Sequence, residues 1–263
     1  MKRLDSREGD RALFELGRVH ALLAFDFDGT LAPIVRVPDQ ARMATGLFRR
    51  LARLAGLAPV AVISGRSLSD LRPRIPPEVQ LCVGNHGSEA ADADPDMETM
   101  NRICHAWVRQ LGERLGGVER DGILIENKGV TISVHYRLAR DRALAERWIT
   151  GWIEELVPTP RVIGGKFIFN LLPQQARTKY EALVEIAARD GVDAVLFVGD
   201  DVTDELVFAQ APSHWVTVRV ERQHGSRARF YIHDQAAMSI LLDRLIAMFE
   251  PQRPERRGVR VPP

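Results

Sequence analysis

The first candidate for chemistry is the acidic segment DFDGTL at residues 26–31, which directly follows the apolar run Ala21–Phe25. Alternation along an extended strand places Asp26 and Asp28 on the same side, and Gly29 allows the chain to turn. Two carboxylates at a strand end can supply a nucleophile, a general acid/base and ligands for a hard cation. A purely structural Asp-Gly turn is the alternative. An EF-hand calcium loop is excluded, because glycine directly follows the second aspartate.

A second acidic segment, GDDVTDE at residues 199–205, follows the apolar run Ala194–Val198. It places four carboxylates within six residues, and crowding so much like charge into a crevice is unfavourable unless a cation neutralises it. The structural alternative is a helix N-terminus, where acidic side chains interact favourably with the helix dipole. That alternative explains the last two acidic residues but poorly explains Asp200 and Asp201.

Positive and hydroxyl groups that suit a phosphate stand elsewhere in the chain. Lys179 is one of only four lysines and opens an expected helix that leads to the second acidic segment. A lysine there can act as a compact point charge for a phosphate, although a solvated helix lysine is the simpler alternative. Ser64-Gly65-Arg66 follows another apolar run and offers a hydroxyl, backbone amides and a guanidinium, or a plain turn.

The pattern of apolar runs around these residues predicts a parallel sheet with helices on both faces. Short buried strands alternate with amphipathic stretches at both ends of the chain, which is typical of α/β domains. Ligands in such domains gather at the carboxyl ends of the strands, so we expect the polar residues that terminate them to converge. The expected strands are 21–25, 59–63, 79–83, 194–198 and 216–218, with helices over 41–55, 176–190 and 234–249.

Residues 97–172 follow a different pattern, which predicts an inserted α+β cap domain with an antiparallel sheet and two helices. Helices are expected near 98–115 and 141–156, and hairpins over 123–137 and 161–171, the second turning at Gly164-Gly165. The predicted core domain is therefore 1–96 plus 173–250. The small, acidic stretch 90–98 is interpreted as a linker. We expect the tail 251–263, with four arginines and four prolines, to be disordered, an anion-binding arm being the alternative.

Composition excludes several classes of protein. The chain has 263 residues, 45% hydrophobic and 27% charged, which suits a globular protein with a sizeable core. A net charge of +1 gives no electrostatic footprint for nucleic acid or an anionic membrane. No apolar run reaches the roughly 20 residues that a membrane span needs. Cys82 and Cys104 are too few for a metal cage, and reduced thiols are expected rather than a disulfide. We expect a cytoplasmic monomer.

These motifs, in this order, resemble the haloacid dehalogenase (HAD) superfamily of aspartate-nucleophile phosphatases, and more narrowly the trehalose-6-phosphate phosphatases. The matching segments are DFDGTLAPI (26–34), VISGR (62–66), GNHGSE (84–89), ENKGVTISVHYR (126–137) and GDDVTDELVF (199–208). The resemblance implies a HAD-like Rossmannoid core with parallel sheet plus the inserted cap. It also implies hydrolysis of a small-molecule sugar phosphate with Mg²⁺ as cofactor.

Carried over residue by residue, the resemblance implies a division of roles. Asp26 would attack phosphorus, and Asp28 would protonate the leaving sugar oxygen and then activate water. Mg²⁺ would be held by Asp26, the backbone carbonyl of Asp28 and Asp200. Asp204 would orient these ligands and Lys179, and Asp201 would also lie in the shell around the ligands. Ser64 and Lys179 would hold the phosphoryl oxygens. This is positioning plus charge neutralisation, which phosphoryl transfer requires.

The resemblance also implies a substrate surface drawn from both domains. Its members would be Arg66, Asn85, His86 and Gly87 from the core and Glu126, Lys128, His135, Arg137 and Asn170 from the cap. The alternative for the cap residues is a polar outer face of a half-exposed sheet. A zinc site on His86 and Glu89 is disfavoured, because a third ligand is missing.

One segment departs from the family pattern. Asn170 stands where the family has glutamate, Leu172 where it has arginine and Tyr180 where it has glycine. These changes leave the catalytic residues in place, but they leave open which sugar phosphate is the substrate. Another glycoside or pseudo-sugar phosphate is the second candidate. A non-catalytic sugar-phosphate sensor is a further alternative. On an alternating strand, Asn170 and Ile168 share one face. If that face covers the site, a neutral amide replaces a carboxylate, and weak handling of trehalose 6-phosphate is expected.

Overall fold

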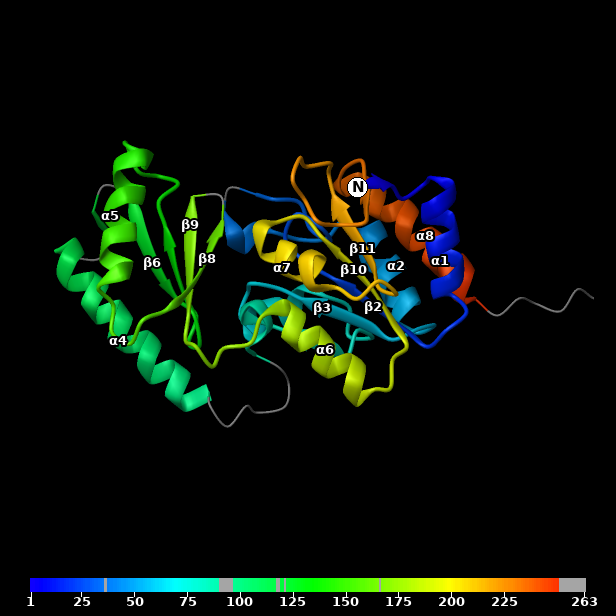
Figure 1. The fold of residues 1–263 in the computed structure, drawn as a ribbon, viewed down its shortest axis with the longest axis horizontal. Coiled ribbons are helices and arrows are strands. Elements are labelled where there is room, and N and C mark those ends of the chain that lie inside the picture. Colours follow the sequence, from blue (N-terminus) through cyan, green and yellow to red (C-terminus); the bar gives the residue numbers. More distant parts are fainter. Residues whose placement is uncertain (36, 90–96, 117–118, 121, 166, 251–263) are drawn as a thin grey trace, which may run out of the picture.

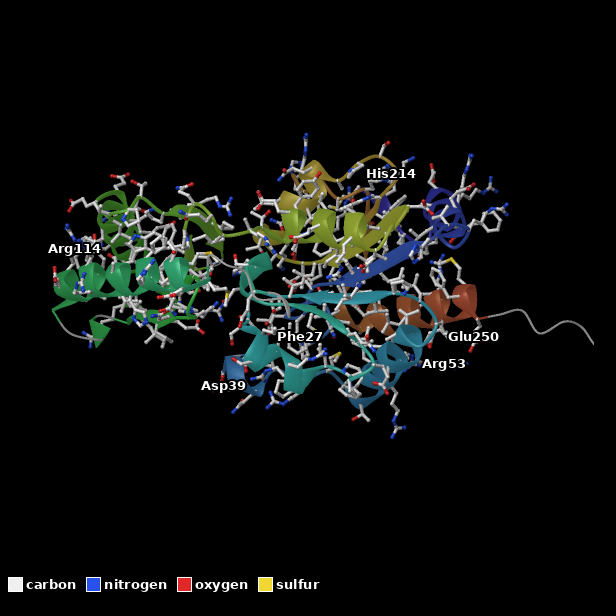
Figure 2. The ribbon with its side chains drawn as sticks, turned by 90° about the horizontal axis from the view of Figure 1, so that it is seen from below. Phe27, Asp39, Arg53, Arg114, His214 and Glu250 are labelled. Atoms are coloured by element: carbon white, nitrogen blue, oxygen red, sulfur yellow. The ribbon has the colours of Figure 1, made fainter. Side chains whose placement is uncertain are left out.

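The structure, a computed structural model, describes residues 1–35, 37–89, 97–116, 119–120, 122–165 and 167–250. Most of the predicted linker and the whole tail 251–263 lie outside these residues. Two lobes are visible, each built on its own sheet (Figure 1). Side chains cover both lobes, with Arg114 on the cap lobe and the ion pair of Arg53 and Glu250 at the opposite end of the molecule (Figure 2).

The core lobe is a seven-stranded parallel sheet, as the alternation of apolar runs predicts. Its strand order is β1-β12-β11-β10-β2-β3-β4. The central strands are uniformly buried, which their unbroken apolar sequences require of a sheet covered on both faces. The strands are β1 (Lys2–Arg3), β2 (Ala21–Phe25), β3 (Val60–Ile63), β4 (Leu81–Val83), β10 (Ala194–Gly199), β11 (Val216–Val220) and β12 (Phe230–Ile232).

Helices cover both faces of this sheet. Alternate residues of β2 divide between the two resulting cores: Leu23 and Phe25 belong to one, Leu22 and Ala24 to the other. The first face carries α1 (Arg7–Leu16), α2 (Thr45–Ala55), the short α3 (Leu68–Leu71) and α8 (Met238–Phe249). The second face carries α6 (Lys179–Arg189) and α7 (Val202–Gln210).

The two acidic segments follow neighbouring strands. β2 and β10 pair in parallel with Phe25 opposite Val198, and the Asp26 amide donates to the Val198 carbonyl at 2.9 Å. Each acidic segment begins within two residues of this register pair. The backbone ladder therefore sets the spacing between Asp26 and Asp200.

The cap lobe is an antiparallel sheet of order β5-β6-β7-β9-β8 with two helices on the side facing away from the core (Figure 1). Directly paired residues share a face: Ile125, Val134 and Phe169 pack toward the helices, and Glu126, Ser133 and Asn170 take the other face. The elements are α4 (Met97–Leu115), β5 (Glu119–Arg120), β6 (Ile123–Asn127), β7 (Ile132–His135), α5 (Arg142–Glu154), β8 (Arg161–Gly165) and β9 (Ile168–Leu172).

The predicted turn of the second cap hairpin is wrong. Gly164 and Gly165 are strand residues that pair with Phe169 and Ile168, and the chain reverses after them, with Phe167 at φ +65°. The glycine pair resembles a tight turn in sequence, but the pairing register of the flanking apolar residues overrides it. The short strands β1, β5 and β12 and the division of the last predicted helix into a 3₁₀ turn and α8 were also not foreseen.

Cys82 and Cys104 are both buried and free; burial of Cys82 was expected from the apolar run in which it stands. Among the described residues, no helix combines the length and apolarity needed to span a bilayer.

Candidate active site

A buried lysine joins the two acidic segments at the carboxyl edge of the core sheet. Lys179 Nζ donates to Asp26 Oδ1 at 2.6 Å and to Asp204 Oδ1 at 2.7 Å. Burial works against its charge, but Asp204 and Asp26 together raise the pKa of Lys179 above its ordinary value. Thr178 caps α6 through its side chain, and this cap fixes the backbone from which Lys179 projects.

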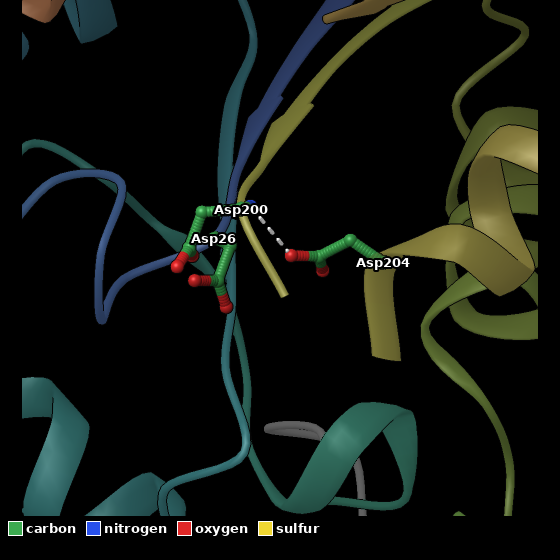
Figure 3. A group of neighbouring side chains, drawn as sticks. All are labelled: Asp26, Asp200 and Asp204. Atoms are coloured by element: carbon green, nitrogen blue, oxygen red, sulfur yellow. Dashed lines mark hydrogen bonds between the residues drawn. The ribbon is translucent and has the colours of Figure 1, made fainter. Parts of the chain in front are cut away.

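Asp204 acts as an internal anchor of the second acidic segment. Its second oxygen accepts the backbone amides of Asp200 at 2.9 Å and Asp201 at 3.0 Å, the first of which is drawn in Figure 3. Asp201 is the N-cap of α7 and Asp200 directly precedes it. The helix N-terminus that the sequence offered as the structural alternative is therefore present.

Asp200 lies against the first acidic segment. Thr30 Oγ1 donates to Asp200 Oδ1 at 3.3 Å. Gly29 has φ +84°, and a Cβ there would stand 2.0 Å from Asp200 Oδ2, so only glycine permits this approach. Burial, followed by the charges of Asp204 and Asp201, raises the pKa of Asp200 to about 8.

The carboxylates of Asp26, Asp200 and Asp204 fit a divalent cation. One carboxylate oxygen from each residue lies within 4.8 Å of the oxygens from the other two, and Figure 3 shows the three side chains together. Burial and the charges of Asp204 and Asp200 also raise the pKa of Asp26 against the opposing effect of Lys179. Such a crowd of buried carboxyl groups needs further positive charge to ionise together, and hard oxygen ligands suit Mg²⁺. Since the oxygens of Asp204 bond Lys179 and two amides, Asp26 and Asp200 are the better side-chain ligands.

This electrostatic arrangement predicts that stabilisation by Mg²⁺ increases with pH. A carboxyl pKa raised on folding stabilises the metal-free protein at low pH, and that contribution is lost as pH rises through about 8. Mg²⁺ would bind the ionised form, so the shift in melting temperature between Mg²⁺ and EDTA should grow from pH 5 to pH 8. Thermal unfolding measures this shift. Asp200→Asn should abolish the pH dependence; a shift that is equal at both pH values would contradict the assignment.

Asp28 does not join the acidic cluster through its side chain. Arg66 grips both of its oxygens, with Nε at 2.6 Å and Nη2 at 2.7 Å. The backbone of Arg66 also donates to Ser64 Oγ at 3.2 Å, and Ser64 is almost fully buried beside the cleft. Arg66, predicted as a substrate ligand, is thus bound to the carboxylate predicted as general acid.

The predicted site residues mostly line one cleft of about 1240 Å³ between the lobes. Asp204, Asn85 and Gly87 do not line it. The predicted residues that do are Asp26, Asp28, Ser64, Arg66, His86, Glu126, Lys128, His135, Arg137, Asn170, Lys179, Asp200 and Asp201.

The turn at residues 85–87 supports the site from beneath. Asn85, His86 and Gly87 all have positive φ, and a Cβ on Gly87 would stand 2.3 Å from the Thr178 carbonyl, next to Lys179. Asn85 holds the cap, donating to the Lys128 carbonyl at 3.2 Å and accepting from Thr131 Oγ1 at 3.2 Å. Asn85 and Gly87 therefore hold neighbouring groups in place and do not themselves line the cleft.

The His86 ring is buried in the cleft wall, and burial, with the nearby charges of Lys128 and Lys179, lowers its pKa well below the ordinary value. Neither ring nitrogen has a hydrogen-bond partner among the described residues. A neutral imidazole offers one donor and one acceptor.

Three polar side chains of the first cap hairpin form a charged cluster over the cleft. His135 Nε2 lies 2.9 Å from Glu126 Oε2, and Lys128 Nζ lies 3.7 Å from the same oxygen. Lys128 Nζ also donates to the Gly65 carbonyl of the core at 3.1 Å. Burial opposes the charge of Glu126, but His135 and Lys128 lower its pKa below the ordinary value.

The departures from the family pattern fall into two kinds. Leu172 is fully buried in a small apolar cluster, and the ring of Tyr180 packs 6.0 Å from that of Trp215, so both serve packing. Asn170 lines the cleft as its strand face predicts, but its oxygen accepts from Ser133 Oγ at 2.8 Å and its nitrogen donates to the Ile163 carbonyl at 3.4 Å. The alternative in which Asn170 bonds within the cap sheet is thus present in the structure.

Sequence reasoning missed several cleft residues. Arg142 and Phe167 line the outer cap side, where the guanidinium lies 4.7 Å from the ring centroid. Asp70 lines the core side and bonds Arg66. Of these three residues, only Asp70 could have been found from the sequence, because it stands four residues after Arg66, a spacing at which oppositely charged side chains on a helix pair.

The fold, a parallel α/β core with an inserted antiparallel cap, is shared with solved structures of HAD-superfamily phosphatases. A solved subclass IIB sugar phosphatase of the HAD superfamily is 14% identical, with a TM-score of 0.55, and the match covers 85% of this chain and 98% of that one. The trehalose-6-phosphate phosphatase C-terminal domain of Candida albicans is 21% identical, with a TM-score of 0.69, covering 94% and 98%.

The sequence profile of the trehalose-phosphatase family matches residues 24–234. A trehalose-phosphate phosphatase of Mycobacterium avium is 33% identical over 239 residues, which cover 79% of this chain. The match spans 59% of that relative's length. The chain belongs to the trehalose-phosphatase family.

Proposed function

We propose that this protein is a Mg²⁺-dependent phosphatase that hydrolyses a sugar phosphate through an aspartyl-phosphate intermediate, with trehalose 6-phosphate as the first candidate substrate. The observation that carries the proposal is the buried contact of Lys179 with Asp26, next to Asp200. The carboxyl group of Asp26, the ammonium group of Lys179 and the carboxyl group of Asp200 then line one cleft beneath a polar cap.

In the first half-reaction, an oxygen of Asp26 forms a bond to phosphorus while the bond from phosphorus to the sugar oxygen breaks. Asp28 transfers a proton to that oxygen, so the sugar leaves as an alcohol. Lys179 and Ser64 balance and orient the charge on the phosphoryl oxygens. Bound at Asp26, Asp200 and the Asp28 carbonyl, Mg²⁺ would supply neutralising charge for the phosphate and its nucleophile.

In the second half-reaction, water attacks the phosphorus of the aspartyl phosphate. Asp28, now a carboxylate, takes the proton from this water, and the Asp26 carboxylate is the leaving group. Inorganic phosphate is released and both aspartates return to their starting states. One residue thus serves as acid and then as base.

The cap surface favours a sugar over a bare or aromatic phosphate ester. The cluster of Glu126, His135 and Lys128 combines acceptors and donors over the cleft, and neutral His86 adds one of each from the core. A cleft of about 1240 Å³ has room for a disaccharide phosphate.

Phosphate release from a panel of phosphorylated sugars tests the function directly. We expect hydrolysis in Mg²⁺, its loss in EDTA, and antagonism by Ca²⁺, whose larger coordination sphere favours bidentate carboxylates and would make Asp26 a poorer nucleophile. Trehalose 6-phosphate should exceed glucose 6-phosphate in kcat/KM. Full activity in chelator would overturn the metal assignment, and no turnover of any sugar phosphate would overturn the proposed function.

The Asn170 position favours a second candidate, a phosphatase for another glycoside or pseudo-sugar phosphate. A carboxylate at this place would accept strong hydrogen bonds from sugar hydroxyls, whereas the amide is already bonded to Ser133 and Ile163. A missing charge-assisted bond costs about 1.5–3 kcal/mol, or about one to two orders of magnitude in affinity.

Asn170→Glu is therefore expected to raise kcat/KM on trehalose 6-phosphate by about tenfold, chiefly through KM. Lys128 and Lys179, the two cations whose charges act on His86, would offset the new buried charge. Asn170→Gln is the matched control, because it has the same length without the charge, and it should show no gain. Unchanged efficiency and substrate preference in Asn170→Glu would remove this position from the recognition surface.

A further inference from the structure

A chain of alternating charges runs from the proposed general acid into the core lobe. It consists of Asp28, Arg66, Asp70 and Arg74. Arg66 bonds both oxygens of Asp28 and, through Nη1, Asp70 Oδ2 at 2.6 Å. Arg74 in turn bonds the other oxygen of Asp70, with its Nε at 3.0 Å.

The far end of this chain is anchored in backbone. Arg74 is buried and donates to the carbonyls of Asp39 and Ala41, each at 3.0 Å. Asp70 belongs to α3, whose N-cap Ser67 accepts the Asp70 amide, so its own backbone is held as well. The chain therefore ends on fixed structure rather than in solvent.

The near end is held with similar geometry. The Arg66 side chain is 10% exposed, and its guanidinium lies 5.5 Å from the centroid of the Phe27 ring. A two-point grip by a planar guanidinium fixes both the position and the plane of a carboxyl group. The Asp28 side chain, by contrast, is 39% exposed.

We infer that Arg66 and Asp70 are positioning residues that orient Asp28 for proton transfer, an inference that rests on the proposed function. A carboxylate has about four lone-pair sites, and the guanidinium uses two of them, one on each oxygen. The remaining site on one oxygen carries the proton toward the cleft. As the phosphorus–oxygen bond breaks, this proton moves to the leaving oxygen, and Arg66 stabilises the carboxylate that remains.

Two substrates that differ in their leaving group distinguish a role of Arg66 in proton transfer from a direct contact with sugar. Phenyl phosphate and p-nitrophenyl phosphate are of similar size and carry no sugar hydroxyls. Nitrophenolate leaves as a stable anion, whereas phenolate, with a conjugate-acid pKa of about 10, benefits from protonation. The ratio kcat/KM reports the steps up to phosphoenzyme formation, so the later base step does not interfere.

In Arg66→Met we expect kcat/KM for phenyl phosphate to fall about a hundredfold, at the lower end of general-acid contributions. The value for p-nitrophenyl phosphate should fall no more than about threefold, because its leaving group needs no proton. Asp70→Asn leaves Arg66 in place but weakens its support, and should lose about tenfold on phenyl phosphate alone. If Arg66→Met fails to fold, Asp70→Asn tests the same role.

Three further variants complete the test. Asp28→Asn and the double variant Asp28→Asn/Arg66→Met should have equal activity on phenyl phosphate, because Arg66 acts through Asp28. Arg50→Met removes a guanidinium that bonds Asp243 at 2.7 Å outside the residues lining the cleft, and both substrates should be unaffected.

Equal losses on the two aryl phosphates in Arg66→Met, or additive losses in the double variant, would overturn the positioning role and identify Arg66 as a phosphate ligand. A gain in activity would also overturn it. If wild-type protein hydrolyses neither the aryl phosphates nor any sugar phosphate, the proposed function itself fails and the inference with it. If wild-type protein hydrolyses both aryl phosphates, the losses of activity in the variants test the positioning role separately from the proposed function.

Discussion

Asp26→Asn is expected to lower phosphate release by at least about a thousandfold, because the amide cannot serve as nucleophile and is a poor cation ligand. The fold should persist. An amide oxygen can still accept from Lys179, and the exchange removes one of three crowded carboxyl groups. We therefore expect the melting temperature in EDTA to stay equal or rise, while the increase caused by Mg²⁺ disappears.

Steady-state phosphate release and thermal unfolding measure the two parts of this expectation. Asp243→Asn is the matched control, since Asp243 pairs with Arg50 on the exposed side of α8 and should leave both quantities unchanged. Activity in Asp26→Asn within about tenfold of wild type would exclude the aspartyl-phosphate mechanism.

Lys179→Met is expected to damage stability and activity together. The substitution leaves Asp26 and Asp204 buried with no cation between them, and losing one member of a buried ion pair costs about 3–5 kcal/mol. Phosphate release should fall by about two to four orders of magnitude, since the phosphoryl oxygens lose a fixed positive charge. The carboxyl groups of the variant take up protons more readily, so its stability deficit should shrink at acidic pH.

Chemical denaturation at pH 5 and pH 8 measures the deficit. In the double variant Lys179→Met/Asp204→Asn, one uncompensated carboxylate is removed, and part of the lost stability should return. A double variant less stable than Lys179→Met would show that Asp204 contributes mainly through its bonds to the Asp200 and Asp201 amides.

Much of the fold could be predicted because each layer leaves a periodic trace in the sequence. Uniformly apolar runs marked β2, β3 and β10, and the alternating cap strands separated Val134 and Phe169 from Ser133 and Asn170. Strands of two or three residues, such as β1 and β12, contain too few residues for any period. The turn predicted at the glycine pair 164–165 was wrong for a related reason. Turn propensity depends on neighbouring residues alone, whereas strand register depends on residues further along the chain.

The candidate site was predictable where a residue follows a strand, because parallel strands bring their carboxyl ends together. Asp26, Ser64 and Asp200 are of this kind. The relations between side chains were not predictable. Nothing in the spacing indicates that Arg66 binds Asp28, or that Asn85 bonds the cap instead of lining the cleft. Such contacts depend on rotamers and on loops that meet only after the lobes pack.

The register between β2 and β10 has a consequence for engineering this protein. Backbone hydrogen bonds between two central strands set the Asp26–Asp200 spacing, and the cap contributes no strand to that ladder. The cap face, by comparison, is one contiguous insertion whose cleft-facing positions alternate along β6, β7 and β9. Grafting or randomising those positions is expected to change which molecule the cleft admits without moving Asp26 and Asp200. Under the proposed function, substrate selectivity and phosphoryl transfer would then be encoded in stretches of the gene that can be exchanged separately.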